Sequence, residues 1–183
     1  MASAMTETME PAIRPGMKPA MASAVPGLVF LLLLSFTPIA EADGRIGIPA
    51  EVPFHPDTTV PEKVKAEFDL GGKVATFITK YNSNVVFSTE PENGQYVEMA
   101  ITEAFAPGGG AWSGPKWMEV TGTLNNNGKK VASFRAKRFS TGGAFAGFKG
   151  TCSIIGRCTK ALGKDIAEWL RDPVDGAELG DAR

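Results

Sequence analysis

Histidine and cysteine are scarce in this chain, and their scarcity excludes several kinds of site. The 183 residues include one histidine, His55, and two cysteines, Cys152 and Cys158. One histidine cannot supply a multi-histidine metal site, and it offers only one candidate base for a histidine-dependent triad. His55 lies between Pro53 and Pro56, and we interpret it as a solvated side chain. We therefore expect no bound metal and no cofactor.

The chain also lacks a large net charge and any sequence motif sufficient for catalysis. Its formal charge is −1, so overall attraction to nucleic acid is not expected. No nucleophile–base pair, paired-carboxylate motif or cluster of metal ligands stands out in the sequence. Because active sites also assemble from distant residues, this pattern favours a non-enzymatic protein without excluding an enzyme.

An apolar run of the roughly 20 residues needed to span a bilayer is missing as well. The shorter run at residues 27–36, GLVFLLLLSF, precedes Ala40-Glu41-Ala42. A positive start, a core of about 7–15 apolar residues and an A-x-A ending are typical of a secretory signal peptide. We predict that residues 1–42 are this peptide, cleaved after Ala42, with Met17 a candidate true start. The protein is thus expected to be periplasmic or secreted, and a permanent transmembrane anchor is the weaker interpretation.

Proline and charge divide the remaining chain into three parts. Residues 43–61 contain four prolines and are expected to form an extended leader. Residues 62–172 are long enough for one α+β domain. Residues 173–183 read as an acidic, flexible tail.

Periodicity predicts the elements of the domain. Residues 63–70 alternate apolar and charged side chains, which favours a half-buried strand. Residues 72–82 fit either the second strand of a Gly-Gly hairpin or a helix with Asp69 as its N-cap, and we favour the helix. Further strands are expected at 84–89, 96–105, 117–124 and 130–139, and a C-terminal helix at about 153–171. This predicts a mostly antiparallel sheet of four to five strands with two helices packed on one face.

The strands at 117–124 and 130–139 form the clearest hairpin. Asn125-Asn126-Asn127-Gly128 joins them, and Asn-Gly between alternating runs is a strong hairpin signal. The alternation predicts which side chains face inward: Met118, Val120, Leu124, Ala132, Phe134 and Ala136. The opposite face of the second strand then carries Ser133, Arg135 and Lys137.

One residue interrupts the alternation of the strand at 96–105. Val97, Met99, Ile101 and Phe105 share a face, and Glu103 falls on the same face. A strand end that opens to solvent is one interpretation. The other is a functional carboxylate, which would make the protein a small periplasmic, hydrolase-like enzyme that uses Glu103 near the glycine-rich loop.

In an oxidising compartment, Cys152 and Cys158 are expected to form a structural disulfide. Six residues of regular helix rise about 9 Å, more than the roughly 4.4–6.8 Å that a disulfide allows between Cα atoms. Cys152 would then have to lie in the incoming loop rather than in the helix of Cys158. The C-x5-C spacing does not match the C-x-x-C of redox catalysts.

The loop at residues 142–147, GGAFAG, approaches the glycine spacing of a phosphate-binding loop. Phe148 stands where that motif requires lysine, and Lys149 follows one position late. We therefore interpret the loop as a strand-to-helix connection whose glycines allow close approach of the backbone.

Basic residues are concentrated in one segment of the chain. Between Val120 and Lys164 there are nine Lys or Arg residues and no Asp or Glu. This segment can present a cationic surface to an anionic lipid, polymer or envelope protein, with Arg135, Arg138 and Lys149 as candidate contacts. Alternatively, these charges pair with the acidic segments on either side.

Several runs in this region resemble a known group of proteins. They are Val120-Thr-Gly-Thr-Leu, Gly128-Lys-Lys-Val-Ala-Ser-Phe, the stretch from Ser140 to Ile154, and Leu162-Gly-Lys-Asp-Ile-Ala-Glu-Trp-Leu. The chain from about 95 to 170 resembles bacterial exported proteins in domain-of-unknown-function families of small envelope proteins and lipoproteins. In that group an arginine-containing strand leads through a glycine-rich loop to a C-terminal helix. The resemblance implies an envelope location and brings no activity or catalytic residue.

Overall fold

The computed structural model describes residues 44–92, 94–109, 112, 114–141 and 150–183. The elements are β1 (Ile46–Ile48), α1 (Glu62–Phe68), α2 (Leu70–Tyr81), β2 (Val85–Phe87), β3 (Gln95–Phe105), β4 (Lys116–Asn126), β5 (Lys129–Ser140), α3 (Thr151–Trp169) and β6 (Ala177–Gly180). The strands form one sheet in the order β2-β1-β3-β4-β5-β6. The predicted α+β class is confirmed, but within the described residues the sheet has six strands and is mixed, and three helices accompany it.

The centre of the sheet is the antiparallel meander β3-β4-β5, which contains the predicted hairpin of β4 and β5. The two-residue turn between β4 and β5 consists of Asn127 and Gly128, which have φ values of 50° and 73°. Tight hairpin turns require positive φ at both central residues, and Asn-Gly adopts them at low cost. The predicted hairpin is therefore confirmed.

The outer strands are parallel to their neighbours, and their presence corrects two predictions. β1 pairs with β2 and β3 in parallel, and β6 pairs with β5 in parallel. β1 falls within the expected irregular leader, and β6 falls within the expected flexible tail. Strands of three and four residues are too short to show a reliable alternation. Helical crossovers bring them to the sheet: α1 and α2 connect β1 to β2, and α3 connects β5 to β6.

The segment predicted as a strand at residues 63–70 is helical instead. α1 covers Glu62–Phe68 and buries Val64 and Phe68. These two residues are four apart, a spacing that places them on one face of either a strand or a helix. The sequence pattern therefore fits both a strand and a helix, and packing of Val64 and Phe68 against the core favours the helix.

The helix predicted at 72–82 is confirmed as α2, which buries Leu70, Gly71, Val74, Ala75 and Ile78. Asp69 occupies the N-cap position, but with a left-handed backbone (φ 44°) and without a capping hydrogen bond from its side chain. It thus separates α1 from α2 as a bend in the chain. The predicted C-terminal helix is confirmed as α3.

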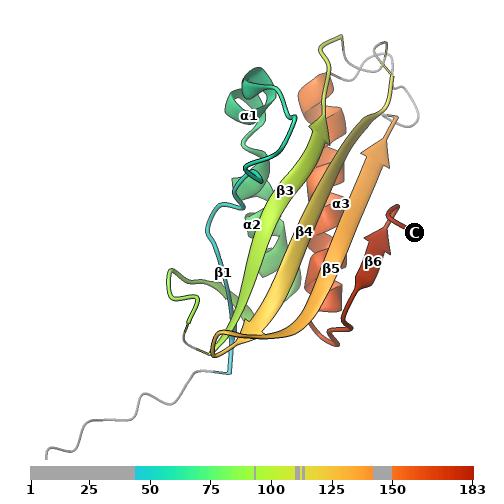
Figure 1. Cartoon of the computed structure of the whole chain (residues 1–183). Helices are drawn as coiled ribbons and strands as arrows, with labels where there is room; N and C mark the ends of the chain where they lie inside the picture. The colour runs from blue at the N-terminus through green and yellow to red at the C-terminus, as the bar shows by residue number, and fades with distance from the viewer. Residues whose placement is uncertain (1–43, 93, 110–111, 113, 142–149) are drawn as a thin grey trace, which may run out of the picture. The chain divides into compact units, whose positions relative to one another are not determined.

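The helices α2 and α3 lie on one side of the central strands (Figure 1). The predicted inward set of β4 and β5 is buried there, against side chains of both helices. These are Met118, Val120, Leu124, Ala132, Phe134 and Ala136 from the strands, with Val74, Ile78, Ile155, Cys158, Leu162 and Ile166 from the helices. No helix of the described residues covers the opposite side of β3-β4-β5, which we call the outer face (Figure 1).

A β-bulge in β3 explains the irregular position of Glu103. Ile101 pairs with Val120, and Glu103 pairs with the next residue of β4, Glu119, so the register shifts across Thr102. An extra residue reverses which side chains face inward from that point on. Ala104 is consequently buried, whereas Glu103 and Phe105 lie on the outer face. The bulge alone explains the position of Glu103, so the strand end need not open to solvent and the Glu103 carboxylate does not face the core.

Candidate functional site

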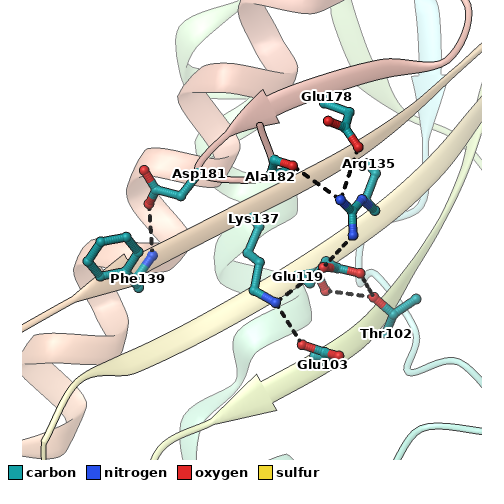
Figure 2. A network of polar contacts seen from close by, with 9 residues as sticks. All are labelled: Thr102, Glu103, Glu119, Arg135, Lys137, Phe139, Glu178, Asp181 and Ala182. Atoms are coloured by element: carbon teal, nitrogen blue, oxygen red, sulfur yellow. Dashed lines mark hydrogen bonds and ion pairs between the residues drawn. The ribbon is translucent and has the colours of Figure 1, made fainter.

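The outer face carries a group of charged side chains at its centre. We call Glu103, Glu119, Arg135, Lys137 and Glu178 the outer-face cluster; they come from β3, β4, β5 and β6. Figure 2 shows these side chains meeting above the strands. Alternation and register bring them together, since Glu119 pairs with Lys137 across β4 and β5, and Arg135 pairs with Glu178 across β5 and β6.

Glu119 is the most buried member of the cluster, with only 7% of its surface exposed. Its carboxylate accepts a hydrogen bond from the Thr102 hydroxyl at 3.1 Å. The same carboxylate lies 3.5 Å from Lys137 Nζ and 3.6 Å from Arg135 Nη1. A carboxylate this poorly hydrated needs such partners, because burying an unpaired charge is costly.

Arg135 and Lys137 each connect several acidic groups. Lys137 Nζ donates to Glu103 at 3.0 Å, and this hydrogen bond raises the pKa of Lys137. Arg135 Nη2 donates to Glu178 Oε1 at 3.0 Å and to the Ala182 carbonyl at 3.1 Å (Figure 2). Glu103 is therefore a member of a structural ion-pair network rather than an isolated carboxylate.

Arg138 points to the other side of the sheet and joins β5 to α3. It donates from Nε and Nη2 to the two carboxylate oxygens of Asp165, at 2.6 and 2.9 Å. Arg138 Nη1 also donates to Asp181 at 3.3 Å. The hydrogen bond with Asp165 raises the pKa of Arg138, and a two-point pair of this kind fixes orientation as well as energy.

The three residues predicted to contact an anionic partner have different environments. Arg135 and Arg138 lie on opposite faces of β5, and both already pair with acidic groups of the chain. Lys149 and the glycine-rich loop lie outside the described residues. At Arg135 and Arg138 the structure thus shows the alternative in which basic charges pair with neighbouring acidic segments.

Two exposed phenylalanines and a half-buried tryptophan lie at one end of the outer face. Phe105, Trp117 and Phe139, which we call the aromatic row, are register partners across β3, β4 and β5. The rings of Phe105 and Trp117 stack with centroids 4.1 Å apart, and Phe139 is 60% exposed. Sequence reasoning missed this row because the bulge at Thr102 is needed to bring Phe105 to this face. Alternation alone could have placed Trp117 and Glu119 there.

Both cysteines lie in α3, and both are free thiols. The disulfide expected between Cys152 and Cys158 is therefore not formed in this structure, because residues six apart in one helix are too distant to bridge. Cys152 is exposed in the first turn. Cys158 is buried and donates to the Lys116 carbonyl at 3.5 Å, and burial raises its pKa to about 11.

We expect the two thiols to differ strongly in reactivity. With a pKa of about 11, only about one Cys158 in a thousand is a thiolate at pH 8, and the thiolate is the reactive form. In the native protein at pH 8, a chromogenic disulfide reagent should modify one thiol rapidly and the second only after denaturation. Cys152→Ser should remove the rapid phase. If the denatured, unreduced protein shows no free thiol, the cysteines are bonded and this arrangement of α3 is wrong.

Open cavities lie at the surface of the described part of the chain. A shallow cavity of about 370 Å³ lies between α3 and β6, lined in part by Arg138, Asp165 and Trp169. Within the described residues, no three or more His, Cys, Asp or Glu side chains are grouped to hold a metal ion. In the same residues, no helix combines the length and apolarity that a membrane span requires.

Comparison with known proteins does not assign the chain to a class. No protein-family model matches it, and no curated protein matches it. Among solved structures, the chain is similar to the PelC dodecamer from Paraburkholderia phytofirmans, with 11% sequence identity and a TM-score of 0.41. The match covers 66% of this chain and 86% of the PelC chain. A similarity this remote identifies neither a family nor a function.

Proposed function

We propose that the chain is an exported, non-enzymatic binding protein that contacts its partner through the outer face of the sheet. The apolar run at 27–36 and the A-x-A ending at Ala42 support export. The aromatic row is the observation that carries the binding proposal. Exposed aromatic side chains that adjoin one another commonly mark interaction surfaces, because they bury large apolar area at low entropic cost.

The arrangement beside the aromatic row fits a binding surface better than a catalytic centre. Glu103 is paired with Lys137, and Glu119 is held by Thr102, Lys137 and Arg135. Polar groups that border an apolar patch are usual at a protein interface. A hydrolase that uses Glu103 would need this carboxylate released from its ion pair, so we place the enzyme hypothesis second.

The test is binding of the purified protein to isolated cell envelopes, with residues of the aromatic row replaced. Phe105→Ser combined with Phe139→Ser should weaken envelope binding about tenfold or more, since central aromatic contacts often dominate binding energy. Phe87→Ser combined with Val174→Ser is the matched control, because these side chains are similarly exposed away from the aromatic row, in β2 and before β6. Equal binding by both double variants would refute the outer face as the binding surface.

Export is tested separately by fractionation and N-terminal sequencing. The mature protein should be recovered outside the cytoplasm and should begin at Asp43. Recovery of an uncleaved chain in the cytoplasm would contradict the exported half of the proposal.

A further inference from the structure

The acidic tail, residues 173–183, is bound along β5 charge by charge. Asp175 lies 3.1 Å from Lys130, Glu178 lies 3.0 Å from Arg135, and Asp181 lies 3.3 Å from Arg138. Asp175 also accepts from the Ser133 hydroxyl at 2.6 Å, and this hydrogen bond lowers the pKa of Asp175. Every carboxylate side chain of the tail thus meets a basic residue of one strand.

Backbone pairing holds the same tail in an extended form. β6 is in parallel register with Phe134–Lys137 of β5. Beyond β6, the Asp181 amide donates to the Lys137 carbonyl at 2.8 Å, and the Phe139 amide donates to the Asp181 carboxylate at 3.1 Å (Figure 2). The tail therefore binds as an added strand, with main-chain hydrogen bonds for affinity and carboxylates for specificity.

The tail also decides the sign of the charge at this edge of the sheet. The pairs described above contain four cations: Lys130, Arg135, Lys137 and Arg138. Outside the tail, their acidic partners are Glu103, Glu119 and Asp165. Without the tail this set has one excess positive charge, and the three tail carboxylates make it negative. An anionic partner would accordingly be repelled while the tail is in place.

We propose that the edge of β5 that β6 covers is a docking site for an acidic, extended peptide segment of a partner protein, and that the tail occupies this site in cis. The inference goes beyond the proposed function, because the edge of β5 is a different surface from the aromatic row. An acidic strand is the favoured occupant because the site already holds one, the tail, through backbone pairing and three carboxylates. A tethered occupant acts at an effective concentration of about 1 mM, so a partner segment must displace it and binds the intact chain weakly.

The test uses the full chain with the tail weakened but present. Glu178→Gln combined with Asp181→Asn keeps the shape of both side chains and removes their charge. The probe is a fluorescent synthetic peptide with the sequence of residues 174–183, VDGAELGDAR. By fluorescence anisotropy at low salt, the double variant should bind this peptide at least tenfold more tightly than the wild-type chain.

Matched controls separate docking from general attraction. Glu51→Gln combined with Glu92→Gln changes net charge equally at exposed positions elsewhere and should leave peptide affinity at the wild-type level. A neutralised peptide, in which Asn replaces each Asp and Gln replaces Glu, should not bind. Adding Arg135→Gln and Arg138→Gln to the double variant should abolish binding.

A second measurement detects displacement in the wild-type chain itself. At millimolar concentrations of the peptide, amide hydrogen exchange at Leu179 and Gly180 should accelerate, because the cis strand is released. Failure of the double variant to bind the acidic peptide more tightly than the wild-type chain overturns the inference. Equal binding of the acidic and the neutralised peptide by the double variant also overturns it. Envelope binding is measured on the aromatic row, so the proposed function can fail while this inference holds, and the reverse.

Discussion

Gly163→Ala is expected to lower the free energy of unfolding by about 2 kcal/mol, although alanine is the better helix former. Gly163 lies in α3 where this helix packs against α2. A Cβ atom added there would overlap Phe77 Cβ and would lie 3.2 Å from the Ile78 backbone nitrogen. Relief of that overlap requires the two helices to separate, because backbone atoms cannot move aside as a flexible side chain can.

Gly156→Ala in the same helix is the matched control. Nothing lies within 4 Å of a Cβ atom added at Gly156. This substitution should therefore raise the free energy of unfolding by about 0.5–1 kcal/mol through helix propensity alone. Urea denaturation of both variants measures the difference. If both substitutions stabilise the protein, α2 and α3 do not approach at Gly163 as described.

Arg138→Gln is expected to lower the free energy of unfolding by about 2 kcal/mol, in the range of hydrogen bonds to charged groups. The loss exceeds that of a typical surface ion pair because the Asp165 carboxylate is only 18% exposed. In the variant, the Asp165 carboxylate would lose both hydrogen bonds from Arg138 and would keep its negative charge. The same substitution should also loosen the tail, which Asp181 helps to hold against β5.

Lys65→Gln provides the comparison for this prediction. Lys65 pairs with Glu62 on the surface of α1 at 2.7 Å, and Glu62 is 87% exposed. Helical pairs of this kind contribute about 0.3–0.5 kcal/mol, and Lys65 Nζ also lies 5.5 Å from the centroid of the Phe54 ring, so the substitution should cost about 1 kcal/mol. Equal destabilisation by Arg138→Gln and Lys65→Gln would show that the contact of Arg138 with Asp165 stabilises the fold no more than a surface ion pair does.

Elements with long, unambiguous patterns were predictable from the sequence. The hairpin of β4 and β5 has eleven- and twelve-residue strands and an Asn-Gly turn, so both the turn and the buried face were correct. The apolar stripe of α3 extends over five turns and was equally clear. The prediction of a strand at residues 63–70, where α1 lies, was wrong because the buried residues Val64 and Phe68 suit a strand as well as a helix.

The candidate site was only partly predictable, because it depends on register. Alternation placed Arg135 and Lys137 on the outer face, as the structure confirms. Their partners come from β3, β4 and β6, at sequence separations that no local pattern encodes. Phe105 and Glu103 in addition required the bulge at Thr102, which local sequence did not announce.

The amino-acid sequence by itself determined the α+β class, the central hairpin, the two long helices and the concentration of basic charge in one segment. These follow from periodicity, turn chemistry and composition, all of which act over a few neighbouring residues. Tertiary structure alone decided that β1 and β6 join the sheet, that both cysteines share one helix, and that the acidic tail covers the basic strand. Such outcomes depend on which distant backbone groups and charges meet, and short segments gain their structure only from that pairing.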